Sequence, residues 1–438
     1  MSTSVIELND SEIRVGTGGR IVWRSPGYSF ITDNNIEIGE AAASKARLHP
    51  RAANNRYWKN LNQDPLPSSS PRARHHADLA YAQLVDIHEH AGKPGNIIFA
   101  VPASFSREQL ALLLGLVEAS PMTAVGLVDS AIAASAALLG RGRYEHLDMQ
   151  LHQCVLTRIE VGEMVSRESV QVIDNVGLVN IYDQAAHLIA DQFIKESRFD
   201  PQHHPETEQA LYDQIPACFN SLLSHAEVAL EVQYQQTQYQ AKLPAELLQA
   251  KLAPLYEKIK AAINTQCPTI ISHQMGRLPG FRASLGNAET LEENSVVQGC
   301  LQYQTDICKS GSALSFVSAL PAASDARIQA VADTREDSIP TTQNKQDPIT
   351  HILHQHSAFP INSSGIYLSA SGTVNTSASD ESHCLLTVNS SSAELSQLGE
   401  LTVFVNGIQV KQTMSLSAGD IISFVGSKTE YVLIHVSG

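Results

Sequence analysis

The chain has 438 residues and a formal net charge of −15, with 43% hydrophobic and 17% charged residues. This length and composition indicate a globular protein of two or three domains, each able to bury a sizeable core. The acidic balance argues against sequence-independent binding of nucleic acid, which needs clustered Lys and Arg to displace counterions. No apolar run reaches the roughly 20 residues that span a bilayer, so we expect no membrane insertion.

Cysteine usage and the first residues bear on the compartment. Six cysteines lie at positions 154, 218, 267, 300, 308 and 384, and none forms a CxxC pair. This spacing favours reduced thiols in a cytosol over a zinc site or a disulfide scaffold. The first ten residues lack a basic segment followed by an apolar one, so we expect no signal peptide and a cytoplasmic protein.

The first hundred residues predict a meander followed by helices. Residues 4–8, 12–15 and 21–23 are expected strands, separated by Asn-Asp-Ser and Gly-rich turns. An Ala-rich helix is expected from residue 40 to 48. Residues 62–74 are rich in Pro and Ser and predict a loop, and a helix over about 78–90 follows.

Residues 96–140 carry the clearest pattern. The apolar run 97–101 ends at Pro102 and predicts a buried strand. Ser106, followed three residues later by Gln109, has the spacing of a capping box at a helix start. A second apolar run at 124–128 leads into a small-residue helix over 130–139. Strand, helix, strand and helix at this spacing predict a βαβα unit with parallel strands.

The next segment mixes strands with long helices. A polar loop is expected after Gly140, then a strand over 153–160 paired with one over 169–174. Helices are expected over 181–197, 208–223, 244–265 and 294–306. Residues 229–239 and 268–272 look like strands.

Composition changes after residue 308. Residues 309–350 are rich in Ser, Ala, Thr, Asp and Pro without sustained periodicity, which indicates a flexible linker. From residue 365, short strands at close spacing predict a small all-β sandwich. We therefore expect a first domain over 1–308, a linker over 309–362 and a second domain over 363–438.

The order of motifs in residues 5–308 resembles the nucleotide-binding domain of the DnaK-type (seventy-kilodalton) heat-shock chaperones, within the actin-like ATPase superfamily. The stretch VPASFSREQLALLLGLVEASPMTAVGLVDSAIAASAALLG is similar to that family's strand, helix and connecting segment. IISHQMGRLPGF is similar to its adenosine-binding strand and turn. The resemblance implies an α/β, two-lobed fold with a repeated mixed sheet and helices. It also implies ATP held between two glycine-containing hairpin loops.

The nucleotide motifs themselves depart from that family. Where it has Asp-x-Gly-Thr, residues 7–11 read Glu-Leu-Asn-Asp-Ser, and its Asp-x-Gly-Gly-Gly-Thr is matched to Thr-Arg-Ile-Glu-Val-Gly at 157–162. The connecting segment reads Asp-Ser-Ala at 129–131, and the adenosine turn reads His-Gln-Met at 273–275. Lost glycines, added bulk and an added carboxylate all oppose a phosphate. Lys59 falls near the family's catalytic lysine, and surface solvation is the simpler interpretation. We expect a pseudo-ATPase without catalytic residues or cofactor.

Residues 365–438 resemble a forkhead-associated (FHA) β-sandwich, chiefly through LTVFVNGIQVKQTMSLSAGDIISFVG. Such domains bind phosphothreonine, and the matched binding positions here are His383 and Asn406. Asp380 stands where the family has a Ser. No Lys or Arg occurs between His351 and Val410, although phosphate recognition normally uses such a cation.

Several histidines lie close together in the sequence, at 75–76, 88 and 90, 203–204, and 351, 354 and 356. None is accompanied by Cys or carboxylates at a defined ligand spacing, apart from the Glu between positions 88 and 90. We therefore expect no metal site.

The favoured function is a non-catalytic interaction or scaffold protein with protein partners in a bacterial cytoplasm. In it, a degenerate actin-like domain is tethered to an FHA-like module. One alternative is a divergent ATP-binding chaperone-like protein or nucleotide-gated switch. A second is a phosphothreonine-dependent adaptor.

Overall fold

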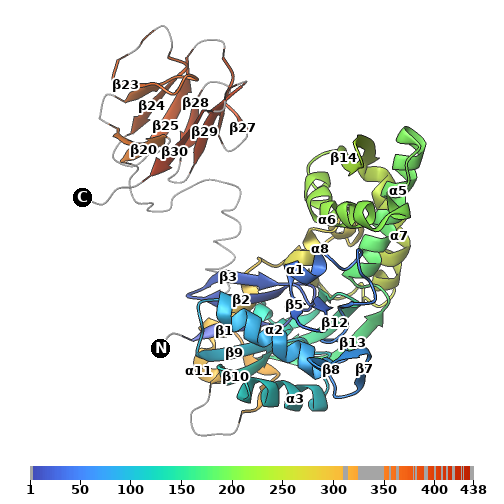
Figure 1. Ribbon diagram of the computed structural model, residues 1–438. Helices are drawn as coiled ribbons and strands as arrows, with labels where there is room; N and C mark the ends of the chain where they lie inside the picture. Colours follow the sequence, from blue (N-terminus) through green and yellow to red (C-terminus); the bar gives the residue numbers. More distant parts are fainter. Residues whose placement is uncertain are drawn as a thin grey trace. The chain divides into compact units, whose positions relative to one another are not determined.

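The computed structural model describes residues 3–308, 314–323 and 350–434, the last range apart from 355–356, 362–364, 378, 380–381, 389–392, 399–400, 406–407, 411–412, 417–419, 426 and 428. The chain divides into two compact units, Met1–Arg335 and Glu336–Gly438. The first is a mixed α/β structure and the second is built of strands (Figure 1). No helix in the described part of the chain has the length and apolar character needed to cross a membrane.

The first unit begins with a six-stranded sheet in the order β18-β10-β9-β1-β2-β3. Its strands are β1 (Ser4–Glu7), β2 (Ile13–Thr17), β3 (Arg20–Ser25), β9 (Asn96–Val101), β10 (Thr123–Asp129) and β18 (Phe316–Val317). Strands β1, β2 and β3 form the expected antiparallel meander, and β9 runs parallel to both β1 and β10. The predicted βαβ arrangement is therefore confirmed. We call residues 4–129 the first lobe.

Helices α2 (His76–His90) and α3 (Arg107–Glu118) pack on this sheet. The predicted capping box is confirmed, because Ser106 Oγ accepts the Gln109 amide at 3.2 Å and Gln109 Oε1 accepts the Ser106 amide at 2.9 Å. Gln83 on α2 is fully buried. Its Oε1 accepts hydrogen bonds from Tyr57 and Trp58 at 2.6 Å, and its amide group donates to Ser25 Oγ and Pro26 O at 2.9 Å.

The rest of the first lobe consists of short elements: β4 (Ser29–Ile31), β5 (Ile36–Ile38), α1 (Glu40–Ala43), β6 (Ala53–Asn54), β7 (Pro65–Ser70) and β8 (Ala73–His75). The expected helix over 40–48 is thus only one turn long. The expected loop over 62–74 is wrong, since β7 and β8 pair in an irregular antiparallel hairpin. Pro65 is compatible with this hairpin because it begins an edge strand, where no amide donor is needed.

A second six-stranded sheet has the order β17-β16-β11-β12-β13-β19. Its strands are β11 (Gly142–Met149), β12 (Gln153–Val161), β13 (Met164–Asp174), β16 (Thr269–Ile271), β17 (Glu289–Thr290) and β19 (Ala319–Pro321). The polar loop expected after Gly140 is wrong, because most of it is the central strand β11. Buried Glu145 on β11 is satisfied by Arg158 at 2.9 Å and by the Asn264 amide at 2.7 Å. We call residues 142–290 the second lobe.

Helices α5 (Leu178–Ser197), α6 (Pro205–Leu222) and α7 (Ala245–Lys260) and the β14–β15 hairpin build the outer part of the second lobe (Figure 1). The hairpin consists of β14 (Glu227–Tyr234) and β15 (Thr237–Pro244). The shorter elements are η1 (Pro201–His203), α8 (His273–Gly276) and α9 (Phe281–Ser284). Their core includes Phe193, Phe219 and Tyr256.

Three helices lie between the two sheets: α4 (Ser130–Ser135), α10 (Ser295–Gln302) and α11 (Gln304–Ile307). One hydrophobic core joins residues of both sheets with α4 and α10, including Val5, Ile159 and Val297. Gly299 is needed for this packing, since a Cβ there would lie 1.8 Å from Ala133 O. The two lobes are therefore joined by a common hydrophobic core.

Two short strands of the first unit fall inside the predicted linker. β18 pairs with β10, and β19 pairs with β13. Leu320 is fully buried, which shows why this stretch is held against the sheet. The remaining linker residues of this region, 309–313 and 324–349, lie outside the described ones.

The second unit contains two antiparallel sheets, in the orders β21-β20-β30-β29-β26-β27 and β23-β22-β24-β25-β28. The first has β20 (His351–His354), β21 (Ser357–Pro360), β26 (Val403–Val405), β27 (Ile408–Gln409), β29 (Ile421–Phe424) and β30 (Glu430–Ile434). The other has β22 (Ile366–Leu368), β23 (Val374–Asn375), β24 (Cys384–Val388), β25 (Ala393–Gln397) and β28 (Thr413–Leu416). Strands β20 and β21 were expected to be linker, and buried Ile352 draws β20 into the core.

Candidate functional site

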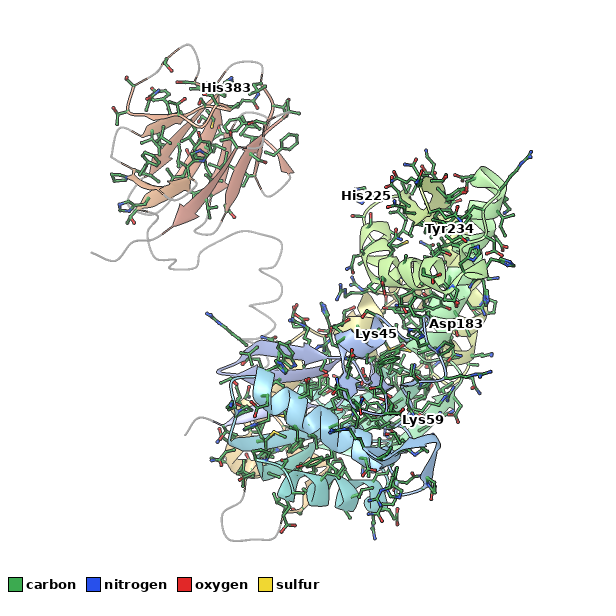
Figure 2. The ribbon with its side chains drawn as sticks, in the orientation of Figure 1. Lys45, Lys59, Asp183, His225, Tyr234 and His383 are labelled. Atoms are coloured by element: carbon green, nitrogen blue, oxygen red, sulfur yellow. The ribbon has the colours of Figure 1, made fainter. Side chains whose placement is uncertain are left out.

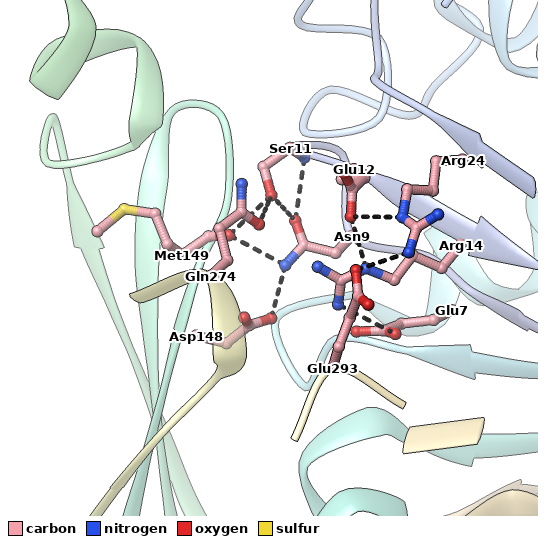
Figure 3. Close-up of polar contacts among 10 residues, drawn as sticks. All are labelled: Glu7, Asn9, Ser11, Glu12, Arg14, Arg24, Asp148, Met149, Gln274 and Glu293. Atoms are coloured by element: carbon pink, nitrogen blue, oxygen red, sulfur yellow. Dashed lines mark hydrogen bonds and ion pairs between the residues drawn. The ribbon is translucent and has the colours of Figure 1, made fainter. Parts of the chain in front are cut away.

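Two turns from different lobes meet face to face. The first joins β1 to β2, and the second, residues 150–152, joins β11 to β12. Asn9 Nδ2 donates to Asp148 Oδ2 at 2.9 Å and to Met149 O at 3.0 Å (Figure 3). The Leu151 amide donates in the opposite direction, to Asp10 Oδ1 at 2.8 Å. We call this contact, formed by residues 7–12 and 148–152, the seam.

A third element closes the seam. Ser11 Oγ lies 2.6 Å from Gln274 Oε1 on α8 and 3.1 Å from Met149 O (Figure 3). Asn9 and Ser11 are 5% and 6% exposed, so the turns contact one another directly, with side chains filling the contact. The expectation that residues 273–275 fill a purine space stays a prediction; in the structure Gln274 contacts Ser11 instead of standing apart from the turns.

The second hairpin matched from the sequence is in the wrong place. Residues 157–161 lie inside β12, which is paired on both sides with β11 and β13. The turn that faces Asn9 is seven residues earlier, at Gln150. Both lobes repeat one pattern, a strand with a parallel neighbour followed by two antiparallel strands. That repeat, at 4–25 and 142–174, is the signal that could have located the second turn.

The seam is rich in carboxyl groups. Glu7 and Asp10 are each 6% exposed, and Asp148 is half-buried. Burial, reinforced by the negative charge of Asp148, raises the pKa of Glu7 and of Asp10 to about 7. Burial also raises the pKa of Asp148.

The Arg14 guanidinium acts on Glu7 and Asp148. Arg14 Nη1 lies 3.6 Å from Glu7 Oε2, while Arg14 Nε makes a closer contact, 2.6 Å, with Glu12 Oε2 (Figure 3). Glu7 Oε2 accepts no hydrogen bond from the described residues. The positive charge of Arg14 is therefore shared, and negative charge prevails in the seam when its carboxyls ionise.

Ion pairs also cross between the lobes. Lys59, which Figure 2 labels, pairs through Nζ with Asp174 Oδ1 at 2.6 Å, so this lysine bridges to β13. Asp129, fully buried, pairs with Arg167 at 2.7 Å and accepts the Ala131 amide at 3.0 Å as the N-cap of α4. Both residues singled out from the sequence thus hold the lobes together.

Beside the seam lies a cleft of about 930 Å³. Its floor includes Ser11, His152 and Gln274, and its walls come from residues 40–56 of the first lobe and from α5 and α6 of the second. Such a volume is typical of a small-molecule or peptide site.

Contacts bridge the two walls of the cleft. Arg47 pairs with Asp183 at 2.7 Å, and its guanidinium lies 3.7 Å from the Tyr212 ring centroid. Figure 2 shows Asp183 on the second-lobe wall. The Arg47 amide also donates to Gln209 Oε1 at 2.8 Å. Sequence reasoning missed Arg47 because nothing local distinguishes it from an exposed arginine.

The carboxyl groups of the seam can hold protons and can bind cationic or polar ligands. An anion close to them would be repelled whenever they are ionised. Among the residues that the structure describes, no three His, Cys, Asp or Glu side chains are grouped to hold a metal ion.

In the second unit, the two predicted binding residues have different outcomes. His383 Nδ1 accepts the Ala370 amide at 3.2 Å, and its ring makes an edge contact with Phe424, 5.9 Å between centroids. The imidazole is thus bound within the sandwich. Asn406 and Asp380 lie outside the described residues.

No protein-family model matches the chain, and no curated protein shows a significant match to it.

Proposed function

We propose that this chain is a non-catalytic interaction scaffold, in which a degenerate actin-like domain of the DnaK type is tethered to an FHA-like sandwich. The observation that carries the proposal is the closed seam. Asn9, Asp10 and Ser11, which the resemblance matches to the family's first phosphate loop, bond directly to the facing turn and to Gln274. Phosphate there would have to displace these bonds.

Electrostatics supports the same proposal. A triphosphate would approach three carboxyl groups, of which Glu7 and Asp148 share one partly engaged arginine and Asp10 feels a positive charge from Lys59, which is itself paired with Asp174. Like charges in a site of low polarity repel strongly, and phosphate sites are instead built from backbone amides and cations. Neither lobe supplies a glycine in the two facing turns.

Protein partners fit what the first unit offers. The cleft has the size of a ligand site, and its walls combine Tyr182 and Phe219 with charged side chains of both signs, such as Glu40 and Arg277. In the FHA-like unit, His383 is engaged by the backbone, so phosphothreonine recognition has no supporting contact in the described residues.

Thermal unfolding of the full chain with ATP and Mg²⁺ tests the proposal. A ligand at 100 times its Kd stabilises a protein by about 2.7 kcal/mol. We expect no rise in Tm at about 5 mM ATP–Mg²⁺ beyond the change that Mg²⁺ alone causes. A saturable, ATP-specific rise would instead establish the nucleotide-binding alternative.

A further inference from the structure

The seam holds three carboxyl groups that have to share a small, poorly hydrated space: Glu7, Asp10 and Asp148. Two of them are 6% exposed. They come from both lobes, since Glu7 ends β1 and Asp148 lies near the end of β11. Any charge change among them therefore acts across the boundary between the lobes.

Two of the bonds that close the seam end on carboxyl groups. Asp148 accepts from Asn9 at 2.9 Å, and Asp10 accepts from the Leu151 amide at 2.8 Å. When the carboxyl groups are protonated they carry no charge, and these two hydrogen bonds hold the turns together without electrostatic repulsion. When they ionise, the bonds remain possible, but mutual repulsion and the demand for hydration oppose the closed contact.

The surrounding charged groups do not cancel this repulsion. Arg14 is shared with Glu12, and Lys59 is paired with Asp174. His146 is buried, and burial lowers its pKa to about 4, so it is neutral near pH 7. The charged or titratable groups that face Glu7 and Asp10 are Glu12, Arg14, Tyr28, Tyr57, Lys59, His146, Asp148, His273, Glu292, Glu293 and Cys300.

A small void gives water a way to reach Glu7. It measures about 20 Å³ and is lined by Glu7, His146 and Asp148. Glu7 Oε2 and His146 Nδ1 are buried and have no hydrogen-bond partner among the described residues. This is room for one water with polar partners, so ionisation of Glu7 can begin with hydration at this point.

We propose that the seam is a proton-controlled hinge, in which protonated Glu7 and Asp10 keep the two turns together and their ionisation separates the turns and opens the neighbouring cleft. Ser11 of the seam also lines the cleft, and it is bonded to Gln274, which lines the cleft as well, so the two are linked. The hinge goes beyond the scaffold function and is independent of it, because lobe opening is measurable without a partner.

The size of the effect follows from linkage. Glu7 titrates at about 7 when buried and at 4.5 when free, and Asp10 at about 7 and 3.8. Because the pKa of each group is higher in the closed state, the closed state is favoured most at a pH below the free pKa. This preference is lost as the pH rises through the free pKa to about 7. If opening restores the free values, the opening equilibrium constant rises about ten-fold for each group between about pH 6 and about pH 8.

Hydrogen–deuterium exchange of the full chain, corrected for intrinsic exchange rates, measures this opening. The reporter is the Leu151 amide, which donates to Asp10. We expect its protection to fall between ten- and a hundred-fold from about pH 6 to about pH 8 in the unaltered chain. The β14–β15 hairpin, remote from the seam, serves as an internal reference and should show no such fall.

Two variants complete the test. Glu7→Gln/Asp10→Asn removes both titrations with little change in shape and leaves that of Asp148, so protection at Leu151 should then fall much less with pH than in the unaltered chain. Asp33→Asn, at an exposed turn of the first lobe, should keep the dependence of the unaltered chain. Constant protection in the unaltered chain overturns the hinge even if the double variant does not fold, and so does an unchanged dependence in a folded double variant.

Discussion

The buried pair between Asp129 and Arg167 allows a quantitative prediction. Asp129 is fully buried and ends a strand of the first lobe, whereas Arg167 lies on β13 of the second. Their atoms are 2.7 Å apart, and the Arg167 guanidinium also lies 5.3 Å from the Phe316 ring centroid. Replacing Arg167 by Met keeps the apolar stem but leaves the Asp129 carboxylate buried without its cation.

Breaking a buried pair from one side typically costs about 3–5 kcal/mol. The Arg167 side chain is 24% exposed, so we expect the lower end, about 3 kcal/mol, for Arg167→Met. Asp129→Asn should cost only about 1 kcal/mol, because the amide keeps the cap on Ala131 and Arg167 can turn to solvent. The loss in Arg167→Met should shrink as pH falls, since protonation then removes the buried charge.

Urea unfolding followed by tryptophan fluorescence measures both values, since both tryptophans lie in the first lobe. Arg143→Met is the matched control. Its side chain is 61% exposed and 3.7 Å from Glu160, so it should change stability by less than about 0.5 kcal/mol. Equal losses for Arg167→Met and Asp129→Asn, or a loss below about 1 kcal/mol for the former, would refute the reasoning.

Three other outcomes are expected. Gln83→Leu removes the hydrogen-bond partner of three buried groups, Tyr57 Oη, Trp58 Nε1 and Ser25 Oγ, and should lower stability by about 3 kcal/mol in the same urea assay; a loss under about 1 kcal/mol contradicts the bond network. Gly299→Ala should cost about 3 kcal/mol by overpacking against Ala133 O, measured as a fall in Tm, and an unchanged Tm argues against the close approach. Iodoacetamide should label the half-buried Cys267 in the native protein but not Cys300, whose pKa burial raises; mass spectrometry of native and unfolded samples distinguishes them.

Sequence patterns predicted the structure correctly where it is set by interactions between residues a few positions apart. The capping box at Ser106 and the apolar run before Pro102 predicted a helix start and a strand end, because both depend on residues a few positions apart. Polar strands were missed for the opposite reason. Glu145 on β11 is satisfied by Arg158 and by the Asn264 amide, 119 residues away, and no window of sequence shows that partner.

The sequence predicted only one of the two turns that form the candidate site. The turn at Asn9 was located, because Asn-Asp-Ser is typical of turns. Its partner at Gln150 was not, since Gln, Leu and His carry no turn signal and the resembled glycines are absent. The contact that defines the seam joins Asn9 to Asp148 across 139 positions, so it follows from the repeated strand pattern of the two lobes and not from any motif.

That repeat also accounts for the unusual acidity of the seam. Each lobe has a carboxyl residue at or next to the end of its first sheet strand, Glu7 in β1 and Asp148 in β11, and the facing turns bring the two ends together. Two like charges meeting in a buried contact need a cation, a proton or solvent. Arg14 is already engaged by Glu12. The described side chains offer the buried carboxyls no further unpaired cation, so protons on Glu7 and Asp10 neutralise the negative charge of the contact. The closed seam and its sensitivity to pH are therefore two consequences of one arrangement.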